Sequence, residues 1–335
     1  MRVVVFGATG TIGAALVTVL SRDHDITAVS RSPEESRDEH SVRWVRADVN
    51  DEQSVGRAME GVETAYYLVH SLGKEGFEER ERRSADGFAR AAEKAGLRQI
   101  VYLGGLGDDA DDLSPHLRSR RETEQRLAAG SVPVTTLRAG MVVGKGSAAF
   151  DTIAALIDRL PAMILPRWAK TPTQPIALVD VVRYLAGVCG NEDALEQTYD
   201  VGGPEVMSYA DMIRRVGRIK GRFPRLVEVP LLTPWLSALW IELVTPARAD
   251  VARPLIEGLR NPTVAKDERI RSLVPFHLTP FDEAARELLR KAAFHSRPHL
   301  HEPARPPPRR RPGEEALNRR SARPGGADAT HDWWS

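Results

Sequence analysis

A glycine-rich turn near the start of the chain has the residue types and spacing of a phosphate-binding loop. It reads Gly7-Ala8-Thr9-Gly10-Thr11-Ile12-Gly13, after an apolar run and before a helical pattern. Backbone N–H groups and the positive end of a helix dipole then face the same point. The first glycine lets the chain reverse, the second lets the backbone approach phosphates, and the third lets the helix pack on the sheet. We therefore predict a dinucleotide site formed by Gly7, Thr9, Gly10, Thr11, Ile12 and Gly13.

The end of the second predicted strand bears on which dinucleotide binds. NAD-selective folds place Asp or Glu about 20 residues after the turn, where it holds the ribose hydroxyls. Here the strand ends in Ser30-Arg31-Ser32, and a guanidinium suits a 2′-phosphate. We expect NADP(H) to be preferred and NAD(H) to be possible. The alternative is that Arg31 is solvated and paired with Glu34. After the third strand, Asp48 and Val49 are placed to meet the adenine, although Asp48 can also cap the following turn.

Alternating strand and helix patterns predict the fold that positions these residues. Short apolar runs predict six strands, over residues 3–6, 26–30, 42–45, 64–69, 99–103 and 134–137. Helical patterns between them begin near Thr11, Glu52, Gly76 and Pro115, and left-handed glycines are expected at their ends, at Gly61, Gly96 and Gly130. This is the βαβ pattern of a Rossmann-type, doubly wound parallel sheet of the α/β class. We assign the NAD(P)-binding domain to residues 1–145.

Residues 146–295 are predicted to form a smaller α/β substrate lobe that is partly interleaved with the sheet. The expected elements are helices over 147–160 and 209–219, short strands at 176–178 and 198–201, and a helix towards Val188 with Asp180 as its N-cap. Such a lobe usually lies over the carboxyl ends of the strands. Residues 296–335 hold eight arginines and seven prolines but almost no aliphatic residues, which predicts a disordered tail.

Composition limits the partners. The 335-residue chain has 47 basic and 46 acidic residues, so its net charge of +1 predicts no specific nucleic-acid binding. The single cysteine, Cys189, and the absence of a signal-peptide layout favour the cytoplasm. No run reaches the roughly 20 apolar residues that span a bilayer. No metal site is expected, because the histidines at 295, 299 and 301 lack partner ligands.

A tryptophan-containing stripe at 234–241 leaves several readings open. Core packing is the default. The alternatives are an apolar lid over the substrate or a membrane-interface helix over 231–244. Together with the basic tail, the last of these would allow weak membrane-surface association. No pattern predicts an oligomeric state.

Taken together, these motifs resemble the atypical short-chain dehydrogenase/reductases, in the NmrA-like and triphenylmethane-reductase-like NAD(P)H-binding branch. The resemblance extends to about residue 290. It rests on the glycine turn, Asp48-Val49, Tyr67-Leu-Val-His-Ser71, and the segments Pro175-Ile-Ala-Leu-Val-Asp180 and Tyr199-Asp-Val-Gly-Gly-Pro204. It implies that the nicotinamide end passes near His70 and Ser71 and that the second lobe forms the substrate pocket. Alternatively, His70 simply ends the strand.

The resemblance also implies a Tyr-x-x-x-Lys motif for proton transfer, and this chain departs from it. His116 stands at the tyrosine position and Arg120 at the lysine position. Four residues apart on a helix, both would face the cleft or, alternatively, the solvent. The preceding strand has Leu103-Gly104-Gly105-Leu106 where a hydroxyl is usual. A neighbouring guanidinium disfavours imidazolium, so we expect His116 to be neutral at neutral pH and weak as an acid.

We therefore expect an oxidoreductase that transfers hydride to a small, apolar, conjugated acceptor such as a quinone or a cationic dye. The alternative is a protein that binds NAD(P)H without turning it over, either a sensor of the NmrA type or an assembly or accessory subunit like the one in respiratory complex I. A sugar-nucleotide epimerase or dehydratase ranks third, because that chemistry depends on the missing tyrosine.

Overall fold

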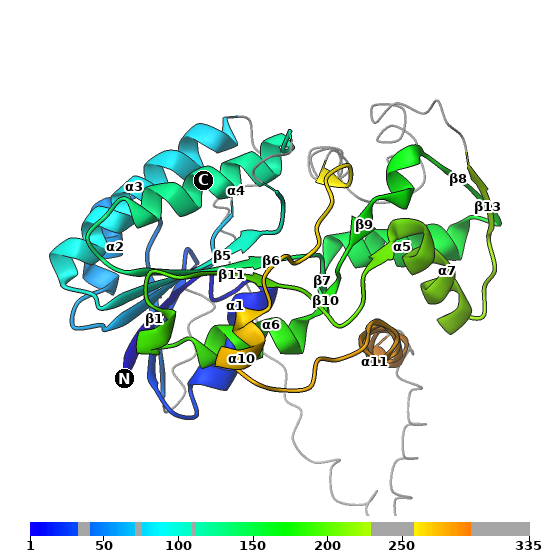
Figure 1. Ribbon diagram of the computed structural model, residues 1–335. Coiled ribbons are helices and arrows are strands. Elements are labelled where there is room, and N and C mark those ends of the chain that lie inside the picture. The colour runs from blue at the N-terminus through cyan, green and yellow to red at the C-terminus, as the bar shows by residue number, and fades with distance from the viewer. Residues whose placement is uncertain (33–40, 71–75, 109–111, 229–257, 296–335) are drawn as a thin grey trace, which may run out of the picture. The chain divides into compact units, whose positions relative to one another are not determined.

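A seven-stranded parallel sheet forms the centre of the protein (Figure 1). The computed structural model describes residues 1–32, 41–70, 76–108, 112–228 and 258–295. The strand order is β11-β6-β5-β4-β1-β2-β3. The strands are β1 (Arg2–Phe6), β2 (Asp25–Ser30), β3 (Val42–Arg46), β4 (Thr64–Tyr67), β5 (Gln99–Gly105), β6 (Val134–Ala139) and β11 (Thr198–Val201). The six strands expected from the apolar runs and the doubly wound α/β fold are confirmed.

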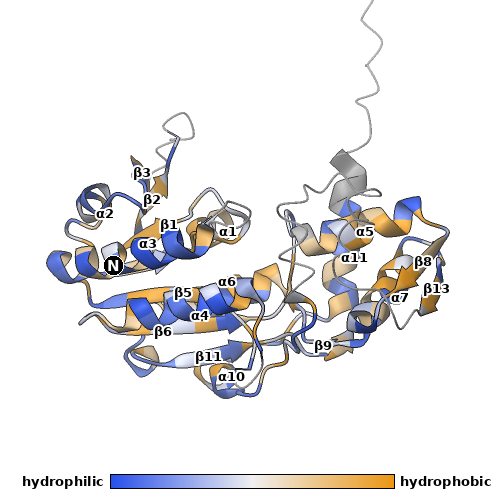
Figure 2. Ribbon diagram, turned by 90° about the horizontal axis from the view of Figure 1, so that it is seen from above, coloured by the Kyte–Doolittle hydropathy of each residue, from blue (hydrophilic) through white to orange (hydrophobic). Residues whose placement is uncertain are grey.

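Helices cover both faces of this sheet, which explains why its strands are apolar runs rather than alternating patterns. On one face lie α1 (Thr11–Leu20), α6 (Leu178–Gly187) and α10 (Arg269–Leu273), and on the other α2 (Glu52–Ala58), α3 (Phe77–Ala95) and α4 (Pro115–Ala128). The pleat divides β1 between two cores: Val3 and Val5 join one, Val4 and Phe6 the other. In Figure 2 much of α3 is hydrophilic, whereas β5 is predominantly hydrophobic.

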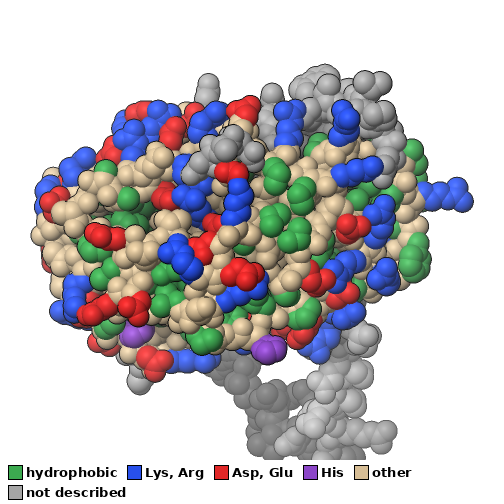
Figure 3. Space-filling model, viewed as in Figure 1, with side chains coloured by type: hydrophobic (Ala, Val, Ile, Leu, Met, Phe, Trp, Pro, Cys, Tyr) green, Lys and Arg blue, Asp and Glu red, His purple; other side chains and the backbone are tan. Residues whose placement is uncertain are grey.

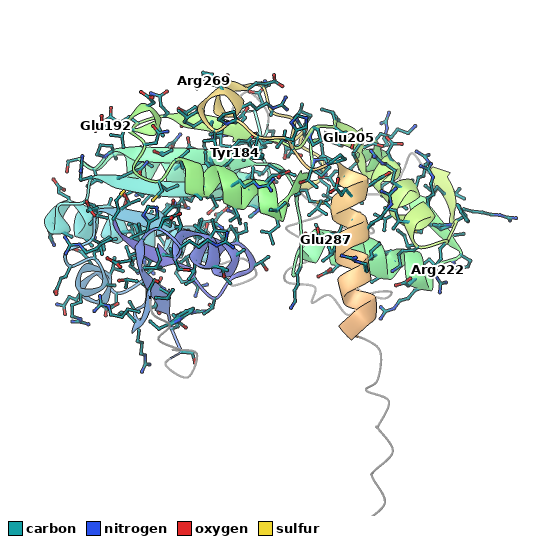
Figure 4. All side chains as sticks on the ribbon, turned by 90° about the horizontal axis from the view of Figure 1, so that it is seen from below. Tyr184, Glu192, Glu205, Arg222, Arg269 and Glu287 are labelled. Carbon is teal, nitrogen blue, oxygen red and sulfur yellow. The ribbon has the colours of Figure 1, made fainter. Side chains whose placement is uncertain are left out.

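The seventh strand comes from the second lobe. β11 pairs in parallel with β6, so the lobe contributes an edge to the central sheet. Arg269 of α10 donates from Nη2 to the Thr198 carbonyl at 3.0 Å, and its guanidinium lies over the Tyr199 ring (Figure 4). Buried Tyr66 donates from its hydroxyl to the Leu185 carbonyl at 2.8 Å. The lobe and the sheet thus share the β11–β6 strand pair. The domain boundary at residues 145 and 146 stays a prediction.

The rest of the lobe packs around its own core. Its helices are α5 (Ala148–Arg159), α7 (Tyr209–Ile219) and α11 (Phe281–His295), with short helices η2 (Arg167–Lys170) and η3 (Glu192–Ala194). Three strand pairs complete it: β7 (Val142–Val143) with β10 (Ile176–Ala177), β9 (Pro172–Thr173) with β12 (Met207–Ser208), and β8 (Ala162–Leu165) with β13 (Arg225–Glu228). The helices expected over 147–160 and 209–219 are confirmed.

Two local expectations are wrong. Asp180 is not the N-cap of α6, because Ala177 takes that position. Fully buried in the first turn of α6, Asp180 instead accepts the backbone N–H of Thr279 at 2.7 Å, just before α11. Gly61 and Gly96 are left-handed as expected, but Gly130 is not, because α4 ends on right-handed Ala129.

Several expectations fall on residues outside the described ranges. These are the stripe at 234–241, the proposed interface helix at 231–244, the tail at 296–335, and the Arg31–Glu34 pair. Within the described ranges, no helix is long and apolar enough to cross a membrane. No group of three potential metal ligands gathers in these ranges either. On the face shown in Figure 3, basic and acidic side chains are interspersed.

Candidate cofactor site

A cavity of about 410 Å³ opens at the carboxyl ends of β1, β2, β3 and β4. Seven of the predicted cofactor residues line it: Gly7, Thr9, Gly10, Arg31, Asp48, Val49 and His70. The lining is completed by Phe6, Val29, Ser30, Ala47, Asn50, Leu68, Val69 and Arg80. Residues from five separate segments of the sequence, four strand ends and α3, therefore meet at the edge where open α/β sheets bind their ligands.

Close backbone contacts require glycine at positions 7 and 13 of the turn, and the space at position 10 is tight. Gly7 has a φ of +90°, and a Cβ there would lie 2.7 Å from the Leu68 carbonyl oxygen. A Cβ on Gly13 would lie 2.1 Å from the Gly7 carbonyl oxygen, so only glycine lets α1 start this close to the turn. A Cβ on Gly10 would meet only the Gly7 oxygen, at 3.2 Å, which leaves its other side open. The three roles predicted for the glycines are compatible with this geometry.

The start of α1 is suited to an anion. Its N-cap, Gly10, has no side chain to accept a hydrogen bond, whereas α2, α4, α5 and α7 all begin with a side-chain cap. The first intrahelical bond of α1 runs from Ala14 N to Gly10 O at 2.9 Å. The N–H groups of Thr11, Ile12 and Gly13 therefore remain available, as in helices that bind phosphate. These three residues do not line the cavity with side chains, so backbone donation is the contribution we expect from them.

Two of the predicted residues, Asp48 and Arg31, border the cavity just after β3 and β2. Asp48 Oδ1 accepts from the Asn50 backbone N–H at 2.9 Å and from Asn50 Nδ2 at 2.6 Å, so this carboxylate caps the turn and also borders the cavity. The two roles that the sequence left open for Asp48, capping the turn and facing the cofactor, are thus compatible. Arg31 is exposed at the same cavity.

Arg80 on α3 is a second guanidinium in the lining, and sequence reasoning missed it. Its surroundings, Glu78-Glu79-Arg80-Glu81-Arg82-Arg83, have the charge pattern of a solvated helix face. One turn later, Ser84 donates to Asn50 Oδ1 at 3.0 Å, which holds α3 against the loop after β3. Only this packing between distant segments brings Arg80 to the cavity.

Elsewhere in the lining, His70 contacts Arg120, the residue at the lysine position of the motif. Arg120 Nη1 lies 2.8 Å from His70 Nε2 and donates to the Leu103 carbonyl at 3.2 Å. Tyr102 donates from its hydroxyl to the Arg120 carbonyl at 3.1 Å. Arg120 therefore contacts a residue of the cavity lining, and its role in the cleft stays a prediction.

Both histidines here favour the neutral form. Burial and the Arg120 guanidinium lower the pKa of His116 to about 3. Desolvation, then Arg120, then His116, lower the pKa of His70 well below its usual range. One edge of His70 is exposed, which weakens the desolvation, so the guanidinium at 2.8 Å is the firmer cause. This agrees with the expectation that His116 is neutral, which stays a prediction.

Buried carboxylates fix α4, the helix that carries His116 and Arg120. Glu124 accepts from Arg138 Nη2 of β6 at 2.7 Å and from Arg121 Nη1 at 3.0 Å. Ser119 donates to the buried Glu81 of α3. Because α4 is tied to both β6 and α3, the Arg120 guanidinium has a defined position beside His70.

Comparison with known proteins finds a family model that matches the part of the chain containing this cavity. A family model described as NAD(P)H-binding matches residues 7–154, which span the glycine turn, the cavity and His70 with Arg120. Residues 7–154 form an NAD(P)H-binding domain. The solved structures that resemble this chain, among them a triphenylmethane reductase, share its fold.

Two curated proteins and one solved structure illustrate the range of similar proteins. NADH dehydrogenase [ubiquinone] 1 alpha subcomplex subunit 9 from Arabidopsis thaliana is 23% identical over 242 residues, covering 68% of this chain and 60% of that protein. Photosystem II assembly factor Ycf39 from Synechocystis is 23% identical over 246 residues, covering 69% and 71%. Triphenylmethane reductase from Citrobacter sp., complexed with NADP(H), superposes with a TM-score of 0.68 at 17% identity, covering 86% of this chain and 100% of that one. At this identity the structural likeness concerns the fold alone.

Proposed function

We propose that this NAD(P)H-binding protein is an oxidoreductase that prefers NADP(H) and reduces a small, apolar, conjugated acceptor. The observation that carries the proposal is the contact between Arg120 and His70, which lines the cavity, with His116 close enough to act electrostatically on His70. These three residues offer hydrogen bonds and positive charge, but no group that releases a proton near neutral pH. Such a site favours hydride acceptors that do not need a proton from the protein.

The residues of the cavity fit a phosphorylated dinucleotide. The free N–H groups at the start of α1 would hold the pyrophosphate, and Asp48 with Val49 would border the adenine. Arg31 and Arg80 would hold the 2′-phosphate, since guanidinium groups bind phosphate with charge-assisted hydrogen bonds. When bound, the reduced nicotinamide supplies a hydride.

The chemistry of these three residues limits the acceptor. A guanidinium keeps its protons, and neither histidine is an imidazolium at neutral pH. A cationic dye that gains a hydride becomes neutral and needs no proton. A quinone that gains a hydride becomes an anion, which positive charge and N–H donors stabilise until water supplies the one proton that completes the hydroquinone.

A second function is favoured by the same departure from the family motif. Without a Tyr–Lys pair, the protein would hold NADP(H) as part of an assembly or accessory role, or as a sensor. In support, two of the similar proteins are named as a respiratory NADH dehydrogenase subunit and as a photosystem II assembly factor.

Direct binding and turnover separate these functions. Purified protein is titrated with NADPH and NADH by fluorescence, and NADPH absorbance is then followed with quinones and cationic triarylmethane dyes. The oxidoreductase proposal predicts saturable binding and acceptor-dependent oxidation. Saturable binding without oxidation of NADPH by any acceptor in the panel would favour the accessory function.

Cofactor choice is tested with Arg31→Asp. Loss of a charge-assisted hydrogen bond costs about 1.5–3 kcal/mol, so NADPH affinity should fall by about 10- to 100-fold, while NADH affinity changes little. Arg22→Asp, on the turn after α1 and absent from the cavity lining, is the matched control. Equal losses for both dinucleotides would remove Arg31 from 2′-phosphate binding.

A further inference from the structure

The contact between Arg120 and His70 defines where the histidine carries its proton. A guanidinium has five N–H donors and no acceptor. Because Arg120 Nη1 lies 2.8 Å from His70 Nε2, that ring nitrogen must accept and therefore has no hydrogen. The single proton of the neutral ring then resides on Nδ1.

We propose that Arg120 locks His70 as its neutral Nδ1–H tautomer, and that this N–H is a fixed hydrogen-bond donor to the carbonyl oxygen of the acceptor. The role in reduction rests on the proposed oxidoreductase function, whereas the tautomer does not. Within the described residues, no group accepts a hydrogen bond from His70 Nδ1, and the residue is exposed in the cavity lining. The donor is therefore available to a ligand.

Two further hydrogen bonds hold Arg120 near the ring, one through its side chain and one through its backbone. Besides His70, its Nη1 donates to the Leu103 carbonyl, and its own carbonyl accepts from Tyr102. Both anchors belong to β5, which lies inside the central sheet. Arg120 therefore differs from an exposed surface arginine, whose side chain would adopt many rotamers.

The charged groups around the ring oppose a second proton. Arg120 and His116 face it from α4, and the pKa of His70 is lowered by both. Across the cavity lie Arg80 of α3 and Asp48 of the loop after β3. Asp48 is the only carboxylate in this lining, and its Oδ1 already accepts two hydrogen bonds from Asn50. Imidazolium therefore has no strong partner among the described groups.

A neutral imidazole N–H can polarise a carbonyl without giving up its proton. As hydride adds to a conjugated acceptor, an electron pair moves onto the carbonyl oxygen. The His70 N–H stabilises the resulting oxyanion, and water later protonates it. A cationic dye without a carbonyl gains nothing from this donor, so the acceptors respond differently to its loss.

Nitrogen-15 NMR of the histidine side chains tests the tautomer in the full-length protein without cofactor. We expect His70 to show a protonated Nδ1 and a bare Nε2, with no titration between about pH 7.5 and about pH 5. In Arg120→Met, His70 should become a mixture of tautomers and titrate nearer to its usual pKa of 6.5. Arg118→Gln, an exposed change on the same helix, should leave the signals unchanged. A protonated Nε2, or ordinary titration in the unmodified protein, overturns the proposal even if Arg120→Met does not fold.

Kinetics test the donor role separately. His70→Phe should lower quinone reduction by about 100-fold or more, the usual cost of removing an oxyanion donor, and affect cationic dyes much less. Equal losses for both acceptor classes would refute donation to a carbonyl. The NMR result does not depend on turnover, so failure of the oxidoreductase function and failure of the tautomer assignment are distinguishable.

Discussion

Replacing His116 with glutamine should make the protein more resistant to acid. The folded-state pKa of His116 is about 3, against an ordinary value of 6.5, because the ring is largely buried beside Arg120. Between these two values the unfolded chain binds a proton that the folded chain does not. Stability is therefore lost as the pH falls below 6.5, and His116→Gln removes this contribution.

The size of the effect follows from linkage. One proton taken up only by the unfolded state costs about 1.4 kcal/mol per pH unit. From 6.5 to about pH 5 the loss is at most about 2 kcal/mol, since the ring keeps some contact with water. This loss of free energy does not depend on the exact folded-state pKa, because any pKa below about 4 leaves the folded histidine mostly unprotonated at about pH 5.

Urea unfolding followed by tryptophan fluorescence at about pH 7 and about pH 5 measures the difference. The unmodified protein should lose up to about 2 kcal/mol more than His116→Gln on acidification. His277→Gln is the matched control, because that histidine is exposed on the loop before α11. If the unmodified protein and His116→Gln lose the same free energy, the buried, neutral His116 is refuted.

Three further changes test the packing. Gly13→Ala should abolish NADPH binding in a fluorescence titration and lower unfolding free energy by about 1–3 kcal/mol, because its Cβ would lie 2.1 Å from the Gly7 carbonyl oxygen. Gly56→Ala is the same chemical change inside α2 with no atom within 4 Å, and should raise unfolding free energy by about 0.5–1 kcal/mol; a loss would contradict the open space seen there. Asp180→Ala should cost about 1–3 kcal/mol in urea unfolding, because it leaves the Thr279 N–H without its acceptor, and an unchanged midpoint would show that α11 does not depend on this contact.

Local patterns predicted most of the nucleotide-binding half. Strands buried on both faces are short apolar runs whose ends are marked by turns, so β1 to β6 could be read directly. The glycine turn was equally accessible, because its conformational demands act over seven neighbouring residues. Arg31 and Asp48 followed from their positions just after strands, where a parallel sheet presents its residues to one edge, and His70 from the family resemblance.

The features that the sequence could not predict depend on contacts between distant segments. The pattern at 198–201 predicted a strand, but nothing local specifies that β11 pairs with β6. Arg80 has the sequence context of a solvated helix and reaches the cavity only because α3 is bound to the loop after β3. The Asp180 side chain was assigned to its own helix, but burial turns it towards Thr279, 99 residues away.

The pairing of β11 with β6 also constrains how the protein can be made. During synthesis the first six strands leave the ribosome well before residues 198–201. The backbone groups on the outer edge of β6 therefore stay unpaired until β11 has been synthesised. A fragment that stops at residue 145 would keep that edge permanently, and Tyr66 would lose the Leu185 carbonyl that its hydroxyl binds. We therefore expect the nucleotide-binding half, expressed alone, to aggregate, and the nascent chain to depend on a chaperone until its last central strand is in place.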